Sequence, residues 1–253
     1  HAIPAVYFSD TATEHVRLLV QQFKLPTLTC PPDSGEYLFA DAEGVSLCRA
    51  EEKGRVRVDF GGGAAQYRRT KGGGELIAKA VNHTAKPTVW DCTGGLGRDS
   101  FVLASLGLNV QTFEQHPAVA CLLADGLERA LQEPEIQDIA RRITFRHGDA
   151  VELMRELAAQ SRPDIVYLDP MYPERQKSAA VKKEMAYFHS VVGAAQEEAE
   201  LLAAARAVAK KRVVVKRPRL GEFFNGEKPA YQYTGKSTRF DVYLPDHPVK
   251  DGE

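Results

Sequence analysis

Hydrophobic residues recur along the chain in two spacings, short strand-like runs and longer runs with helical periodicity. From residue 75 onward the two alternate, which predicts strands at 88–90, 109–113, 143–146, 164–168 and 212–215, and helices at 75–81, 101–106, 118–131, 151–159 and 196–209. Such alternation predicts a mostly parallel sheet with helices on both faces. Two further runs, 231–234 and 239–244, predict a terminal antiparallel hairpin.

The first 74 residues follow a different pattern. A helical run at 11–23 is followed by strand-like runs at 36–40, 45–49 and 55–60, with turns between them. We therefore expect a small α+β unit with a meander at 1–74 and a Rossmann-like α/β domain at 75–253. Two glycine triplets in 61–74 enclose a basic, aromatic stretch that serves either as a linker or as a lid, and its candidate RNA contacts are Arg68, Arg69 and Lys71.

Composition restricts the class of protein. The chain has 253 residues, of which 43% are hydrophobic and 26% charged, with a formal net charge of −1. These values are ordinary for a soluble globular protein, and any nucleic-acid contact must use a local basic patch. The four cysteines form no C-x-x-C pair and the histidines no H-E-x-x-H motif, so we expect no metal. We also expect no secretory leader, no membrane span and a cytoplasmic location.

The stretch 88–99, T-V-W-D-C-T-G-G-L-G-R-D, reads as strand, glycine loop and helix. Such a corner binds ligands in doubly wound α/β proteins, because glycines allow close approach and helix N-termini present free N–H groups. The spacing of Asp91, Gly95 and Gly97 departs from the dinucleotide fingerprint G-x-G-x-x-G. It resembles the first motif of S-adenosylmethionine (SAM)-dependent methyltransferases. Arg98 and Asp99 open the helix beside it.

Four successive predicted strands end at or near an acid: Asp91, Glu114, Asp149 and Asp169. Ligands of open α/β sheets lie outside the carboxyl ends of the strands, so these acids are expected around one crevice. Glu114 is placed to accept from ribose hydroxyls, and Asp149, with the backbone of Ala150, from an adenine amino group. Nearby acids also favour a sulfonium cation. The alternative for each acid is a helix N-cap.

The segment 169–173, D-P-M-Y-P, resembles the (D/N)-P-P-(Y/F) motif of methyltransferases that act on exocyclic base amines. The lone pair of such an amine is delocalised into the ring, so acceptors must draw its hydrogens before it can attack a methyl group. The Asp169 carboxylate and the Pro170 carbonyl are the expected acceptors, and Tyr172 is expected to stack on the base. Met171 replaces the second proline of the motif. The alternative is a plain loop bounded by prolines.

Basic residues lie near this segment and near the fifth strand of the domain. They predict an RNA-binding rim formed by Arg175, Lys177, Lys182, Lys183, Lys216, Arg217 and Arg219. The alternative is an ordinary solvated charged face.

Three segments together carry a family resemblance: D-C-T-G-G-L-G-R-D, Y-L-D-P-M-Y-P-E-R-Q-K-S-A and G-K-S-T-R-F-D-V-Y. Over nearly its full length the chain resembles the bacterial small-subunit ribosomal RNA methyltransferase J family. The resemblance implies SAM-dependent methylation of the N2 amine of one guanine near the 3′ end of 16S rRNA, in the small ribosomal subunit. It also implies SAM contacts at Arg98, Asp99, Glu114, Gln115, Asp149, Ala150 and Asp169.

Without the resemblance, the residues indicate methyl transfer to a base amine but not guanine or ribosomal RNA. Three alternatives stay open at this point. The first is a SAM enzyme that acts on DNA or RNA adenine or on a small amine. The second is an NAD(P)-dependent oxidoreductase, which the glycine spacing disfavours. The third is a catalytically silent RNA-binding module.

Overall fold

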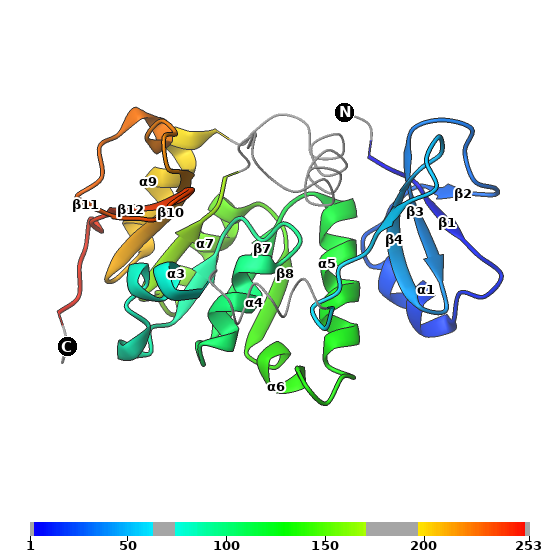
Figure 1. The fold of residues 1–253 in the computed structure, drawn as a ribbon, viewed down its shortest axis with the longest axis horizontal. Helices are drawn as coiled ribbons and strands as arrows, with labels where there is room; N and C mark the ends of the chain where they lie inside the picture. The colour runs from blue at the N-terminus through cyan, green and yellow to red at the C-terminus, as the bar shows by residue number, and fades with distance from the viewer. Residues whose placement is uncertain (1–2, 63–73, 171–196, 251–253) are drawn as a thin grey trace.

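The computed structural model describes residues 3–62, 74–170 and 197–250, and it contains two β-sheets (Figure 1). The larger has seven strands in the order β11-β12-β10-β9-β6-β7-β8. Their bounds are β6 (Val89–Asp91), β7 (Val110–Glu114), β8 (Ile143–His147), β9 (Ile165–Leu168), β10 (Arg212–Pro218), β11 (Tyr231–Thr234) and β12 (Thr238–Tyr243). Strands β6 to β10 are parallel, and β12 is antiparallel to both β10 and β11. The predicted sheet with a terminal hairpin is confirmed.

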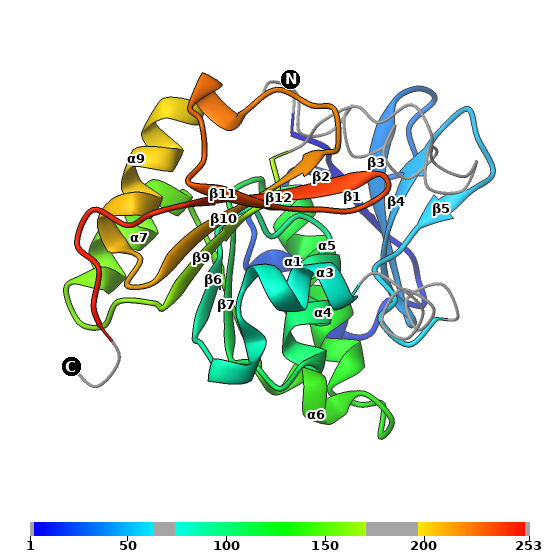
Figure 2. The ribbon, with the colours of Figure 1, turned by 60° about the vertical axis from the view of Figure 1, so that its left-hand side comes forward.

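Helices cover both faces of this sheet (Figure 2). Helices α3 (Gly74–Ala80) and α4 (Arg98–Ser105) bury their apolar residues on one face, while α7 (Ala150–Ala158) and α9 (Glu198–Val208) do so on the other. The remaining elements are α5 (Pro117–Ala130), α6 (Gln137–Ala140), η1 (His83–Ala85) and η2 (Phe224–Gly226). In the described part of the chain, no helix has both the length and the apolar character needed to cross a membrane.

The N-terminal unit is built on the smaller sheet, in the order β2-β1-β3-β4-β5. Its elements are β1 (Val6–Phe8), α1 (Glu14–Gln21), β2 (Thr27–Leu28), β3 (Glu36–Asp41), β4 (Gly44–Arg49) and β5 (Arg55–Val56). The predicted meander is present as β3-β4-β5, but β1 also joins the sheet, parallel to β3 and to the unpredicted β2.

The predicted strand 55–60 is shorter than expected. It ends at Val56, because the chain then leaves the sheet and buries Val58 and Phe60 against the other domain. The Phe60 ring stacks on Phe101 of α4, with 4.4 Å between centroids and 6° between planes. The alternating apolar residues therefore mark an irregular segment, residues 57–60, which we call the strap. It packs within the apolar cluster that joins the N-terminal unit to α4 and α5, and it is not a continuation of β5.

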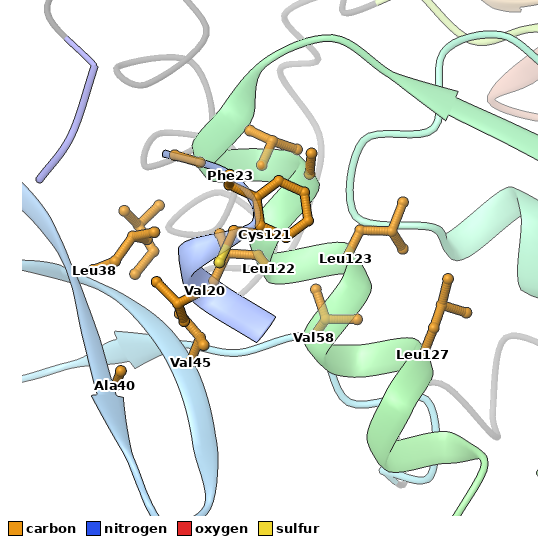
Figure 3. Close-up of a cluster of buried hydrophobic side chains, with 14 of the residues drawn as sticks. Val20, Phe23, Leu38, Ala40, Val45, Val58, Cys121, Leu122, Leu123 and Leu127 are labelled. Carbon is orange, nitrogen blue, oxygen red and sulfur yellow. The ribbon is translucent and has the colours of Figure 1, made fainter. Parts of the chain in front are cut away.

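Helix α5 lies between the two sheets, and its buried residues belong to one apolar cluster shared with the N-terminal unit (Figure 3). Ten members of that cluster are labelled in the figure: Val20, Phe23, Leu38, Ala40, Val45, Val58, Cys121, Leu122, Leu123 and Leu127. A helix that is apolar around most of its circumference is typical of a buried position. The proposed domain boundary at residue 74 stays a prediction, since residues 63–73 lie outside the described part.

Two polar contacts fix α5 against the N-terminal unit. The Asp125 carboxylate accepts from the Val45 backbone N–H at 3.0 Å and from Arg129 at 3.0 Å, and Arg129 also donates to the Val58 carbonyl. Burial raises the pKa of Asp125, and the Arg129 charge opposes that rise. The acid therefore satisfies a backbone donor that the apolar interface would otherwise leave unpaired.

The strap also passes close to the backbone of α5 at Gly126. A Cβ atom there would lie 2.6 Å from the Val58 Cβ atom and 3.1 Å from the Val58 carbonyl oxygen. We expect Gly126→Ala to lower the free energy of unfolding by about 1–2 kcal/mol, because overpacking outweighs the gain in helix propensity. The same change in a Val58→Ala background should cost less. Urea unfolding of the wild type, the two single variants and the double variant measures whether the two changes interact. Additive effects on the free energy of unfolding would contradict a direct contact between these residues.

Candidate active site

The glycine corner joins β6 to α4 through residues 92–97, as the sequence predicted. Gly97 has a φ of +82° and is the N-cap of α4, and its N–H donates to the Gly94 carbonyl at 2.8 Å. A Cβ atom at Gly94 would lie 2.6 Å from Thr112 Cγ2 and 2.8 Å from the Phe113 carbonyl oxygen. The loop thus lies directly against β7, and two glycines are required for this approach.

Asp91 fixes the start of the glycine loop by hydrogen bonds. Its side chain is 2% exposed; Oδ1 accepts from the Thr93 N–H at 3.1 Å, and Oδ2 accepts from the Ser100 hydroxyl at 2.6 Å. Ser100 also contacts the Thr112 hydroxyl at 2.8 Å. Burial raises the pKa of Asp91 to about 6, against the opposing hydrogen bond from Ser100. Sequence reasoning did not find Ser100 or Thr112, because small hydroxyl residues inside apolar runs carry no motif of their own.

Glu114 ties the same loop to the end of β7. Its Oε1 accepts from the Gly95 N–H at 2.9 Å and its Oε2 from the His116 N–H at 2.8 Å. Burial raises the pKa of Glu114, and these N–H donors oppose the rise. The neighbouring Gln115 is exposed, and its carbonyl oxygen lies 3.0 Å from His147 Nε2. Ribose recognition by Glu114 stays a prediction.

Asp149 is the N-cap of α7, since its Oδ1 accepts from the Glu152 N–H at 3.0 Å. The helix-cap alternative is therefore confirmed for this acid. Ala150 is the first residue of α7 and is buried. Asp149 and Ala150 lie beyond the carboxyl end of β8, and their contact to adenine stays a prediction.

Asp99 and Asp169 form a charged cluster with Lys216 and Tyr167 at the centre of the sheet. Asp99 Oδ2 accepts from the Tyr167 hydroxyl at 2.6 Å. Lys216 Nζ lies 3.3 Å from each Asp99 oxygen and 3.8 Å from Asp169 Oδ2. The Asp169 N–H donates to the Thr93 hydroxyl oxygen at 2.6 Å. The glycine loop and the end of β9 are thereby held together.

The two carboxyl groups of this cluster have opposite pKa shifts. Burial raises the pKa of Asp99, but the Lys216 charge and the Tyr167 hydrogen bond outweigh it, so the net pKa is lowered. Partial burial raises the pKa of Asp169, the neighbouring Asp99 and Asp91 carboxylates add to the rise, and Lys216 opposes it. A carboxyl group whose pKa is raised toward neutral pH can both accept and release a proton there, and this property suits proton transfer.

Two of the predicted RNA contacts lie elsewhere than expected. Lys216 contacts Asp99 and Asp169, as described above, and Arg217 is 4% exposed with its Nε donating to the Glu222 carbonyl at 2.8 Å. Alternate residues of a strand point to opposite faces, so neighbouring basic residues of β10 do not form one rim. Arg219 is exposed. Several predicted site residues lie outside the described part of the chain: Arg68, Arg69, Lys71, Tyr172, Arg175, Lys177, Lys182 and Lys183.

The described residues fit SAM as a cofactor. Asp91, Asp99 and Asp169 place carboxyl groups near the carboxyl ends of β6 and β9, where their negative charge favours the sulfonium cation of SAM. Within residues 3–62, 74–170 and 197–250, no group of three His, Cys, Asp or Glu side chains could hold a metal ion. Fold and site together define a SAM-dependent methyltransferase.

Comparisons with known proteins agree with this class. A family model described as putative SAM-dependent methyltransferase matches residues 18–245. Ribosomal RNA small subunit methyltransferase J of Neisseria gonorrhoeae is 68% identical over 95% of this chain and 96% of its own, and the Chromobacterium violaceum protein of that name is 45% identical over 96% of both. The crystal structure of a SAM-dependent methyltransferase from Neisseria gonorrhoeae, 62% identical, matches with a TM-score of 0.84 over 98% of this chain and 99% of that one.

The chain therefore belongs to the ribosomal RNA small subunit methyltransferase J family. The resemblance recognised from the three sequence segments is confirmed, and so is SAM as the cofactor.

The first prediction for this site concerns Gly97. A Cβ atom there would lie 2.5 Å from Leu123 Cδ1 and 2.9 Å from Phe60 Cζ, at a φ that disfavours any side chain. We expect Gly97→Ala to weaken SAM binding about tenfold or more in calorimetry, because the loop must shift. Gly35 is the matched control: its φ is +83° with nothing within 4 Å of a Cβ atom. Gly35→Ala should cost only about 1 kcal/mol of stability and leave SAM affinity unchanged.

The second prediction follows from the raised pKa of Asp91. The folded protein holds the Asp91 proton up to about pH 6, whereas the unfolded chain releases it near its usual value of 3.8. The folded state thus binds more protons in this interval, so stability falls as pH rises through it, by about 3 kcal/mol. The Asp91→Asn variant has no ionisable group at this position, so its stability lacks this contribution to the pH dependence.

We therefore expect Asp91→Asn to gain about 3 kcal/mol in unfolding free energy relative to wild type between about pH 4 and pH 7. Denaturant unfolding without cofactor at several pH values measures the difference. A difference that stays constant across this interval would contradict the assignment.

Proposed function

We propose that this protein transfers a methyl group from SAM to the exocyclic N2 amine of a guanine near the 3′ end of 16S rRNA, in the small ribosomal subunit. Support for the substrate comes from the relatives, which are named for ribosomal RNA of the small subunit. Support for the amine comes from the D-P-M-Y-P segment that follows β9. A ribosomal substrate also favours a cytoplasmic location.

The observation that carries the proposal is the position of Asp169 and Pro170. Both follow β9 directly, and the backbone of Asp169 is held against the glycine loop through Thr93. The Asp169 side chain remains 41% exposed, so a base can reach it. A carboxylate and a carbonyl placed side by side can accept both hydrogens of an exocyclic amine, which turns its lone pair toward the methyl donor.

The reaction then balances without a covalent enzyme intermediate. SAM supplies a methyl group on a positively charged sulfur. The amine nitrogen forms the new C–N bond with its lone pair while the C–S bond breaks, and the sulfur keeps that electron pair. The methylated nitrogen loses one proton, which the Asp169 carboxylate accepts and passes to water.

RNA binding by the basic residues outside the crevice is part of the proposal. Arg219 is exposed just beyond the end of β10, close in sequence to Lys216, which contacts Asp99 and Asp169. We assign phosphate contacts to Arg219, to the basic residues of 175–183 and to Arg68, Arg69 and Lys71, and base stacking to Tyr172. We also retain the division into an N-terminal unit at 1–74 and a methyltransferase domain at 75–253.

The test of the substrate uses 16S rRNA from cells that lack this protein, both as naked RNA and in purified small subunits. Incubation with tritium-labelled SAM, nuclease digestion and mass mapping should give N2-methylguanosine at one position near the 3′ end. Methylated adenine would support the other base amine instead. SAM binding without any transfer would support a silent RNA-binding module, and a thermal shift with NAD but not SAM would support an oxidoreductase.

The third prediction concerns Asp169. At saturating SAM we expect Asp169→Ala to lower the rate of methyl transfer about 100-fold or more, because the amine loses an acceptor for both orientation and proton transfer. Calorimetry with S-adenosylhomocysteine separates this effect from cofactor binding. Asp138→Ala is the control, since Asp138 lies on the surface of α6 with 76% of its side chain exposed. Transfer by Asp169→Ala at the wild-type rate would contradict the role.

A further inference from the structure

Lys216 occupies an unusual place for a basic residue of a predicted RNA-binding rim. It lies on β10, next to β9 in the sheet, and its side chain is only 26% exposed. Its ammonium nitrogen is 3.3 Å from both oxygens of Asp99 and 3.8 Å from Asp169 Oδ2. One cation thus contacts two carboxyl groups that come from different elements, the start of α4 and the end of β9.

The two acids also contact each other. A side-chain hydrogen bond between them lowers the pKa of Asp99 and raises that of Asp169, so Asp169 is the member of the pair that keeps a proton to higher pH. Among the described residues, the pair also faces the Asp91 carboxyl from β6, which adds negative charge, and the Tyr167 hydroxyl from β9, which donates to Asp99. Like charges this close cannot all ionise without a compensating cation.

We propose that Lys216 is a positioning residue of the methyl transfer, whose ammonium group keeps Asp99 ionised and allows Asp169 to reach the carboxylate form that receives the amine proton. The inference rests on the proposed role of Asp169 as the acceptor for the amine, but not on which base carries that amine.

The charge balance among Asp91, Asp99, Asp169 and Lys216 explains this role. Asp169 must be ionised to accept a proton when the C–N bond forms, and it must release that proton to water before the next turnover. The nearby carboxylates of Asp99 and Asp91 favour its protonated form, while Lys216 favours the ionised form. Without Lys216 the pair holds its shared proton to higher pH, so fewer molecules have an acceptor ready at neutral pH.

The sequence-based role of Lys216, a phosphate contact, makes a different prediction. Loss of a phosphate contact weakens RNA binding at every pH and lowers the salt dependence of that binding. Loss of the positioning role changes the single-turnover rate at saturating RNA and SAM, and it does so only at low and neutral pH. The two roles are separated by the rate at saturation, the KM for RNA and the pH profile.

The experiment compares Lys216→Gln, which removes the charge but keeps a hydrogen-bond donor, with Lys216→Arg, which keeps the charge. Lys228→Gln is the matched control, because Lys228 is exposed and lies outside the crevice. Single-turnover methylation is measured from about pH 6 to pH 9, on whichever base the protein methylates. Binding of S-adenosylhomocysteine confirms that the crevice of each variant is intact.

We expect the acidic limb of the profile for Lys216→Gln to move up by about one pH unit, which is about a tenfold loss near neutral pH that recovers at high pH. Lys216→Arg and the control should keep the wild-type limb. An unshifted limb in Lys216→Gln, or equal losses at all pH values, would overturn the proposal. A loss of S-adenosylhomocysteine binding in both Lys216→Gln and Lys216→Arg would also overturn the proposal, because Lys216 would then have a purely structural role.

A second readout needs no substrate. Carboxyl-carbon NMR of aspartate-labelled protein, with the Asp169 signal assigned through Asp169→Asn, follows the titration of Asp169 directly. Its midpoint should rise in Lys216→Gln and stay in place in Lys216→Arg. A midpoint that does not move in Lys216→Gln overturns the inference even if the substrate assignment is correct. A moved midpoint with no methylation of guanine leaves the inference standing and refutes the proposed substrate.

Discussion

The crowding of acids at one sheet edge is the constraint on which the rest of the site depends. Parallel strands deliver their carboxyl ends to the same edge, so Asp91, Glu114 and Asp169 come together and lose hydration. Each is compensated differently: Asp91 by hydroxyl and amide donors, Glu114 by two backbone N–H groups, and Asp169 by Lys216. These contacts do not neutralise all of the negative charge of the acids. The charge that remains lowers the stability of the fold, and it also attracts a sulfonium cation.

The glycine loop is held from two sides, which links the fold to the chemistry. From within the domain, Asp91 and Glu114 fix its backbone by hydrogen bonds. From outside, the strap that ends the N-terminal unit places Phe60 on Phe101 and close to Gly97. Helix α5 anchors that strap, since its apolar residues face the N-terminal sheet as well as the main one. The N-terminal unit therefore helps to support the glycine loop.

Residues with hydrogen-bonding roles were harder to predict than residues with backbone roles. Gly94 and Gly97 were recognised because their loop requires glycine, and the structure bears this out. Asp149 has the local role of a helix cap, which its sequence position already allowed. Tyr167, Ser100 and Thr112 went unrecognised, because a buried hydroxyl inside an apolar strand or helix looks like core until its partner from another strand is known.

The sequence by itself determined the alternation of strands and helices, the terminal hairpin, the glycine corner and the class of reaction, because these depend on local periodicity and on the residue types of short motifs. Only the tertiary structure decided that β1 joins the smaller sheet parallel to β3, that α5 is buried on two sides, and that Lys216 turns toward Asp99. Those outcomes depend on burial and charge pairing between segments far apart in the chain, and such contacts leave no local pattern.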